Sequence, residues 1–125
     1  MTAIWLRLLD GAYAVWQTSE EGAPATAEDG LLSVTRTNDE VSVVGPAALA
    51  PSSGPVESGW RCLEVAGPLS FELTGVLSSL SAPLAVAGIP IFVISTFNTD
   101  YLLVKEGDLD RAVEVLQTEG FAVDG

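Results

Sequence analysis

The longest uncharged stretch of the chain, from Leu73 to Thr99, limits the possible folds more than any other feature. Its 27 residues are enough, by length alone, to cross a bilayer as a helix. Glycines, prolines and serines interrupt it, however, and its apolar spacing changes near Gly88 from a helical period to an extended one. The stretch therefore predicts a buried helix followed by a buried strand, and not a membrane span.

The elements around this stretch complete a βαββαβ order. A strand is predicted over 61–66, and an amphipathic helix over 71–87 that Gly88 ends with a left-handed cap. The predicted elements that follow are a hairpin between Gly88 and Val104, a helix between Asp108 and Gly120, and a strand over 121–123. Right-handed crossovers then give an α+β, ferredoxin-like unit: a four-stranded antiparallel sheet with both helices on one face.

A stretch rich in proline and glycine, Gly45–Gly59, marks the expected domain boundary. We therefore predict two units, 1–58 and 59–125. Within the first unit, Asp10-Gly11 predicts a hairpin between strands over 4–9 and 13–17, and Asn38-Asp39 predicts a second hairpin over 31–44.

The two halves of the chain carry a short internal similarity. Ser33–Val44 and Val93–Val104 superpose without gaps at an offset of 60 residues, which aligns Asn38 with Asn98. One interpretation is a duplicated ferredoxin-like unit whose first copy has lost most of its helices. The other is a chance likeness between two hairpins.

Seventeen acidic residues against five basic ones give the chain a formal net charge of −12. This charge repels nucleic acid and anionic membrane surfaces, so neither is an expected partner. A zwitterion or a small cation meets no such barrier. Acidic residues also keep a protein in solution, and this is the alternative explanation of the net charge.

The chain has one cysteine, Cys62, and no histidine. A single cysteine excludes an intramolecular disulfide and fits a reducing compartment, and the N-terminus lacks a basic region followed by an apolar one, so we expect a cytoplasmic protein. Without histidine, the usual base for a serine or cysteine nucleophile and the commonest metal ligand are both missing. We therefore expect no catalysis, no metal and no cofactor.

The tip of the predicted hairpin holds more polar residues than a turn requires. Hydroxyls, an amide and a carboxylate crowd into six positions: Ser95, Thr96, Asn98, Thr99 and Asp100. One or two such residues suffice for a turn. The surplus indicates a site for a small polar ligand.

Residues 60–124 resemble an ACT domain, a small regulatory module of amino-acid metabolism. The likeness is carried by Thr74-Gly75-Val76-Leu77, by Gly88-Ile89, and by the segment from Ser95 to Tyr101. The last segment is similar to the second ACT unit of bacterial ACT-pair proteins and of the cytosolic arginine sensors of animals. The Ser33–Thr37 and Glu40–Val44 runs resemble the degenerate first unit of the same proteins.

The resemblance implies ACT units that pair side by side, with a free amino acid held between them and a homodimer as the expected assembly. The positions that match the family's site are Ser70, Glu72, Thr74, Gly75, Ser79, Thr96 and Asp100. The start of the helix offers unpaired N–H groups to a carboxylate, and Asp100 can accept an ammonium or guanidinium group.

Each of these residues also has a purely structural explanation. Asp100 can be a turn residue, Thr96 a good strand former, and Ser79 a small residue that allows close helix packing. The main hypothesis is a non-catalytic regulatory or sensor protein that binds an amino acid. The alternative is a structural or interaction module that dimerises, or docks on an unidentified protein partner, through its strand edges.

Overall fold

The computed structural model describes residues 4–66 and 75–125, and these residues form two compact units. One unit spans residues 10–60, and the other combines the described residues up to Leu9 with those from Arg61 onward. One strand, β5 (Val56–Val65), contributes its first half to one unit and its second half to the other. The expected boundary after residue 58 lies close to this division, but the N-terminal strand groups with the C-terminal unit.

The unit over 10–60 is a four-stranded antiparallel sheet in the order β3-β4-β2-β5. Its strands are β2 (Tyr13–Thr18), β3 (Ser33–Arg36), β4 (Val41–Pro46) and the first half of β5. Two short 3₁₀ turns, η1 (Glu20–Gly22) and η2 (Ala47–Leu49), occupy the places of the two helices in a βαββαβ order. The strand order is that of a ferredoxin-like unit without its helices.

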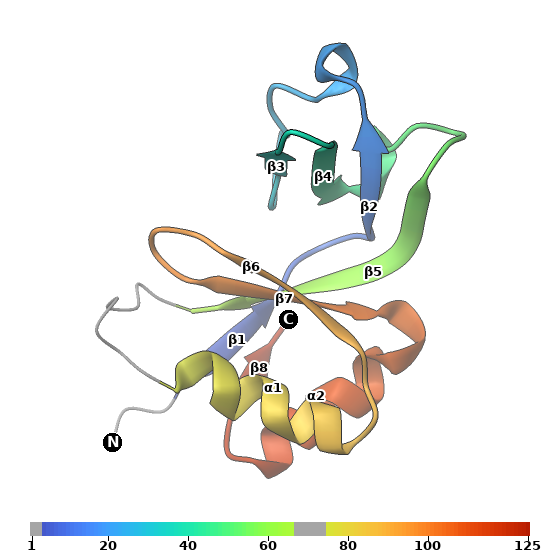
Figure 1. Cartoon of the computed structure of the whole chain (residues 1–125). Coiled ribbons are helices and arrows are strands. Elements are labelled where there is room, and N and C mark those ends of the chain that lie inside the picture. The colour runs from blue at the N-terminus through green and yellow to red at the C-terminus, as the bar shows by residue number, and fades with distance from the viewer. Residues whose placement is uncertain (1–3, 67–74) are drawn as a thin grey trace. The chain divides into compact units, whose positions relative to one another are not determined.

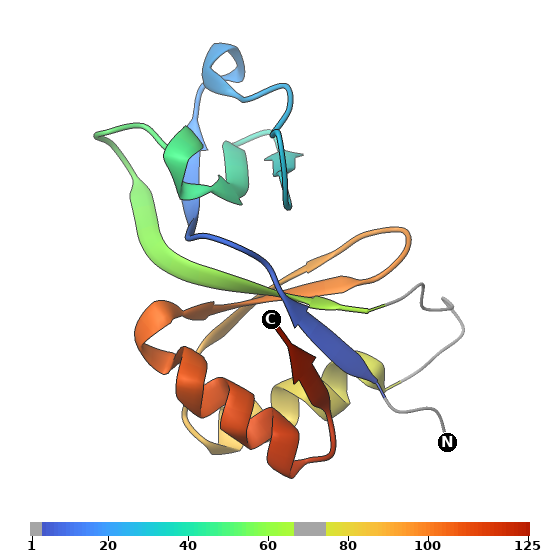
Figure 2. The ribbon, with the colours of Figure 1, turned by 180° about the vertical axis from the view of Figure 1, so that it is seen from behind.

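The second unit keeps both helices. Its elements are β1 (Trp5–Leu8), the second half of β5, α1 (Val76–Val86), β6 (Ile91–Ser95), β7 (Asp100–Lys105), η3 (Glu106–Asp108), α2 (Leu109–Thr118) and β8 (Ala122–Asp124). Both helices cover the same face of its sheet (Figures 1 and 2). This arrangement confirms the predicted α+β class and the predicted order of helices and strands from 61 onward.

The sheet of this unit has five strands rather than the predicted four, because β1 enters it. β1 pairs antiparallel with β5 and parallel with β8, which gives the order β6-β7-β5-β1-β8. The predicted hairpin between 4–9 and 13–17 is therefore wrong: β1 and β2 belong to different units. Gly11 does adopt the positive φ expected of the turn, at 81°, but the strands on its two sides pair with different halves of β5 and not with each other.

The core of the unit lies between its sheet and the two helices. Leu6 of β1 opposes Val65 of β5, and neither side chain is exposed to solvent. Alternation along each strand sends these apolar residues to the helix side. The ten buried residues of the cluster are Leu6, Leu63, Val65, Leu80, Leu84, Ile89, Leu102, Val104, Ala112 and Leu116.

The two predicted hairpins around Asn38 and Asn98 are confirmed, but in a different alignment with each other. Ser33 pairs with Val44, whereas Val93 pairs with Leu102 and not with Val104. The structural equivalence is therefore an offset of 59 residues, and the predicted offset of 60 is wrong. A one-residue shift sends each side chain to the opposite face of a strand, so Asn38 corresponds to Phe97.

With this corrected alignment, the two turns share a hydrogen-bond pattern. Thr37 N donates to Glu40 O at 2.9 Å, and Thr96 N donates to Thr99 O at 2.8 Å. Each threonine Oγ1 also accepts from the backbone N–H three residues on, at 3.1 Å from Glu40 and 3.3 Å from Thr99. The shared pattern supports the interpretation of the chain as a duplicated unit.

Candidate functional site

The predicted ligand residues fall into three groups. Ser70, Glu72 and Thr74 lie outside the described residues. Gly75, with a φ of 78°, directly precedes α1. The hydroxyl of Ser79, one turn further on, donates to the carbonyl of Val76 at 2.7 Å within the helix, so Ser79 is already paired with its own backbone.

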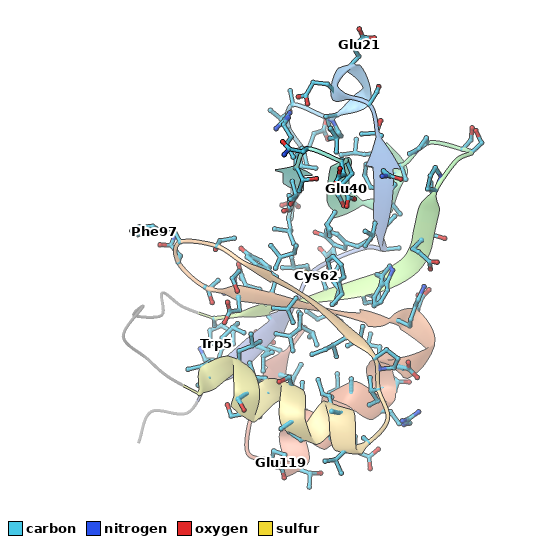
Figure 3. The ribbon with its side chains drawn as sticks, in the orientation of Figure 1. Trp5, Glu21, Glu40, Cys62, Phe97 and Glu119 are labelled. Atoms are coloured by element: carbon cyan, nitrogen blue, oxygen red, sulfur yellow. The ribbon has the colours of Figure 1, made fainter. Side chains whose placement is uncertain are left out.

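Thr96 and Asp100 occupy the tip of the β6–β7 hairpin. Thr96 Oγ1 bonds to both backbone groups of Thr99, donating to its carbonyl at 3.1 Å and accepting from its N–H at 3.3 Å. Asp100 Oδ1 accepts from Ser95 Oγ at 2.6 Å across the hairpin. The side chain of Phe97 projects outward from the tip and is 80% exposed (Figure 3).

Strand alternation places Asp100 and the residues on either side of it on opposite faces of the sheet. Asp100 shares its face with Leu102 and Val104, which belong to the core under the helices. Thr99 and Tyr101 point to the other face. The hydroxyl of Thr99 donates to Val65 O at 2.6 Å, which ties the start of β7 to the end of β5. Asp100 therefore lies on the helix side of the sheet, at the end where β5 stops.

The start of α1 and the β6–β7 tip lie at the same end of the unit in both views (Figures 1 and 2). The predicted site requires this neighbourhood, because it joins Asp100 to the helix start at Gly75. Of the seven predicted residues, Thr96 and Asp100 lie within one hairpin tip. Thr96, however, lines a groove on the opposite face, with residues that the sequence did not single out.

This groove, which we call the Arg7 groove, has a volume of about 410 Å³ and lies on the face opposite α1 and α2. Three adjacent strands and the hairpin tip supply its lining: Trp5, Arg7, Glu64, Ala66, Thr96, Asn98, Thr99 and Tyr101. The sequence does carry a signal for it, the polar positions that alternate with core leucines in Trp5–Leu8 and Cys62–Val65. Only the pairing of β1 with β5 brings those two signals together.

A network of charged and aromatic side chains spans the strands beneath the groove. Arg7 Nη1 lies 3.1 Å from Glu64 Oε1, and the hydroxyl of Tyr101 donates to Glu64 Oε2 at 3.0 Å. The Arg7 guanidinium also lies over the Trp5 ring, 5.3 Å from its centroid. Glu64 therefore has both carboxylate oxygens engaged from two different strands.

Cys62 lies two residues before Glu64 and is fully buried. Burial, and then the nearby Glu64 charge, raise the pKa of its thiol from about 9 to about 12. The thiolate is the nucleophilic form of cysteine. The Cys62 side chain is therefore a packed neutral thiol at neutral pH.

We expect iodoacetamide to leave Cys62 unmodified in the native protein and to alkylate it in urea, as mass spectrometry can show. In the folded chain the thiol keeps its proton up to about pH 12, whereas the unfolded thiol loses it above about pH 9. The contribution of Cys62 to stability is therefore complete below pH 9 and is lost as the pH rises toward 12. Native alkylation as fast as that in urea would contradict this assignment.

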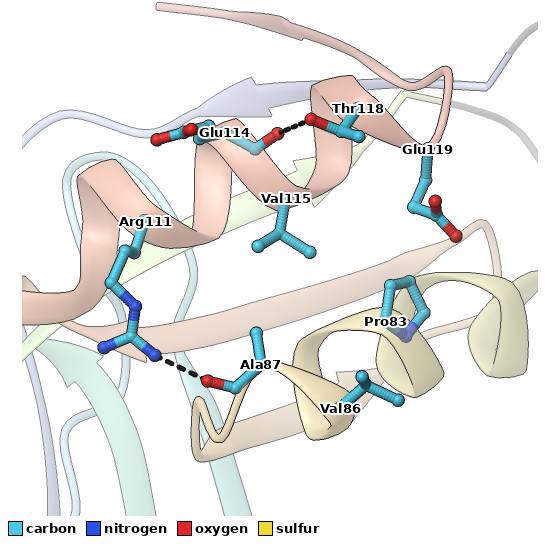
Figure 4. A pocket seen from close by; sticks show the side chains of 8 residues that line it. All are labelled: Pro83, Val86, Ala87, Arg111, Glu114, Val115, Thr118 and Glu119. Carbon is cyan, nitrogen blue, oxygen red and sulfur yellow. Dashed lines mark hydrogen bonds between the residues drawn. The ribbon is translucent and has the colours of Figure 1, made fainter.

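A second groove, of about 440 Å³, separates α1 from α2 (Figure 4). It is lined by Pro83, Val86, Ala87, Arg111, Glu114, Val115, Thr118 and Glu119. Arg111 Nη2 donates to the Ala87 carbonyl at 2.6 Å, and Thr118 Oγ1 donates to the Glu114 carbonyl at 2.9 Å. The first of these bonds ties α2 to the end of α1, and the second lies within α2.

In the part of the chain that the structure describes, no three histidine, cysteine, aspartate or glutamate side chains cluster closely enough to hold a metal ion. Over the same residues, neither helix has the length and apolar character needed to cross a membrane.

A ferredoxin-like sheet with both helices on one face and a polar hairpin tip defines a small α+β domain. The ACT domain family model matches residues 56–118, half of the chain. The chain therefore belongs to the ACT domain family.

The curated relatives include an arginine sensor. The cytosolic arginine sensor for mTORC1 subunit 1 of Pongo abelii is 30% identical over 138 residues, covering 98% of this chain and 41% of the sensor. The Homo sapiens protein of the same name is 42% identical over 77 residues, covering 59% of this chain and 22% of that protein. The chain thus spans less than half the length of these relatives.

Solved structures share the fold over nearly the whole chain. Protein Atu0741 from Agobacterium tumefaciens has a TM-score of 0.83 at 35% identity, covering 98% of this chain and 93% of that one. The aspartate kinase of Clostridium acetobutylicum has a TM-score of 0.63 at 11% identity, covering 93% of this chain and 34% of the kinase. The second likeness shows the fold alone.

Proposed function

We propose that this chain is a non-catalytic regulatory module that binds a free amino acid at the end of the sheet where α1 begins. The observation that carries the proposal is the Asp100 carboxylate, which lies on the helix side of β7 in a protein of the ACT family. Ser95 donates to one carboxylate oxygen, Oδ1, at 2.6 Å. No hydrogen bond to Oδ2 is found within residues 4–66 and 75–125, so that oxygen can accept from a ligand cation.

L-Arginine is the first ligand to test. Two relatives are named as arginine sensors, and a guanidinium group matches a carboxylate through two parallel hydrogen bonds. The acidity of the chain favours a cationic ligand over an anionic one. In this proposal the main-chain N–H groups at the start of α1 receive the α-carboxylate, and Asp100 receives the side chain or the ammonium group.

The test is a thermal-shift titration with each of the common amino acids at millimolar concentration. A ligand that binds only the folded protein stabilises it by about 2.7 kcal/mol at a hundred times its Kd, which for a domain of this size raises Tm by roughly 10 °C. We expect L-arginine to raise the Tm of the wild type and Asp100→Asn to abolish most of that shift.

The matched control is Asp39→Asn, because Asp39 is an exposed aspartate at the tip of the other hairpin. It removes the same charge and should leave the L-arginine shift unchanged. A shift of equal size in Asp100→Asn would rule out the Asp100 site. A wild-type Tm that no amino acid moves would rule out amino-acid binding altogether.

A second function is favoured by the edge of the sheet. Among the described strands, β6 pairs only with β7. Its sequence, Ile-Phe-Val-Ile-Ser, has no charged side chain that would oppose pairing with a strand of another chain. This edge suits a homodimer or a docked protein partner. An oligomer in sedimentation velocity, combined with a Tm that no amino acid moves, would support this interaction function instead.

A further inference from the structure

We propose that the Arg7 groove is a second binding site, for a small zwitterion of the α-amino-acid type. It lies on the face opposite α1 and α2, whereas Asp100 lies on the helix side. The proposal therefore does not depend on the Asp100 site, and either can hold when the other fails.

The charge pattern of the groove is the complement of a zwitterion. Arg7 and Glu64 place a guanidinium and a carboxylate 3.1 Å apart on neighbouring strands, where Arg7 directly opposes Glu64 in the register. An α-amino acid carries a carboxylate and an ammonium group at a similarly short separation. Its carboxylate can bind Arg7 through paired hydrogen bonds while its ammonium group binds Glu64.

The existing pair is weak enough for a ligand to open. The Arg7 side chain is 52% exposed and the Glu64 side chain 22%, and ion pairs in such positions contribute little to stability. Glu64 stays in place when the pair opens, because the Tyr101 hydroxyl holds its second oxygen at 3.0 Å. The Glu64 carboxylate is thus held in position without Arg7, whose guanidinium a ligand would displace from it.

The rest of the groove fits a molecule with a polar end and an organic side chain. Trp5 is 38% exposed and supports the Arg7 guanidinium from one side. Thr96 and Asn98 border the groove from the hairpin tip. A volume of about 410 Å³ is larger than the zwitterionic head alone, so a side chain has room beside Trp5.

The test uses glycine, the smallest α-amino acid, titrated into the full chain and followed by isothermal calorimetry and NMR. Asp100→Asn serves as the parent, which removes the other proposed site. We expect glycine to bind this parent and to shift the Trp5 indole N–H resonance, assigned by its loss in Trp5→Phe. The added change Arg7→Gln should weaken binding by at least about tenfold, because it removes the charged partner of the carboxylate.

The matched control is Arg36→Gln in the same parent. Arg36 is 54% exposed and forms a surface ion pair with Glu20. Arg36→Gln therefore removes one positive charge and one surface ion pair, as Arg7→Gln does. Glycine affinity should change less than about twofold in this control, as expected for a distant surface charge. Acetate and methylammonium, which carry only one of the two charges, should each bind more weakly than glycine.

Two results of the glycine titrations would overturn the proposal. One is glycine binding in Arg7→Gln that equals binding in the Asp100→Asn parent, and the other is no glycine binding to that parent at all. Neither result bears on the proposed function, which is tested by the difference in the L-arginine shift between the wild type and Asp100→Asn. Equal binding of acetate and glycine would also overturn the proposal for the Arg7 groove, since such a result would show that the groove binds any small anion.

Discussion

Replacing Leu6 with alanine should lower the free energy of unfolding by about 2–5 kcal/mol, the usual cost of truncating a buried leucine. Leu6 belongs to β1, has no exposed surface, and packs in the same cluster as Val65 and Leu84. The change removes buried apolar volume and leaves a cavity under the two helices. It lies outside the residues matched by the family model, so the effect tests whether β1 completes the C-terminal unit.

Urea denaturation followed by circular dichroism at 222 nm measures this effect, because both α-helices belong to the same unit as Leu6. Leu49→Ala is the control, since Leu49 is 40% exposed and lies in the other unit. It should cost less than about 1 kcal/mol. Equal losses in the two variants would mean that β1 is dispensable to the helical unit.

Gly30→Ala should cost about 2–4 kcal/mol, from two causes that act together. Gly30 has a φ of 77°, where a side chain costs about 1–2 kcal/mol. An added Cβ would also lie 2.1 Å from the Tyr13 hydroxyl. That ring is only 1% exposed and cannot swing aside, and its hydroxyl accepts from Leu31 N at 3.0 Å. Moving it leaves a buried N–H without its partner.

Gly11→Ala separates these two causes. Gly11 has nearly the same φ, 81°, but a Cβ there meets nothing within 4 Å. We therefore expect this variant to show only the backbone cost, about 1–2 kcal/mol. Urea denaturation followed by tryptophan fluorescence compares the two variants. Gly30→Ala proving no worse than Gly11→Ala would mean that the Tyr13 contact adds nothing.

Local features of the fold were predictable from the sequence. The helix over Val76–Val86, the helix over Leu109–Thr118 and the hairpin around Phe97-Asn98 depend on apolar period and turn chemistry within a few residues. The loss of helices from the first unit was also predictable, because Gly22 and Pro24 interrupt the segment that holds η1. The family resemblance rested on the same local strings.

The candidate site was less predictable. Thr96 and Asp100 both lie in the polar hairpin tip, where each bonds to another residue of the tip. Thr96, however, lines the Arg7 groove, whereas Asp100 lies on the helix side of the sheet. Taken one at a time, Arg7, Glu64 and Tyr101 carry no signal of a site, since each is an ordinary polar residue in an alternating strand. They become a site only when three strands lie side by side.

By itself, the sequence determined which segments are helices and strands, where the turns fall, and which family the chain belongs to. Tertiary structure decided the partners of β1 and therefore the groove that its residues line. The reason is physical: the edge of any strand offers the same backbone hydrogen bonds, so those bonds do not determine which strand it pairs with. The burial of apolar side chains determines the partner. Leu6 reaches a dry core only opposite Val65, nearly sixty residues away in the chain.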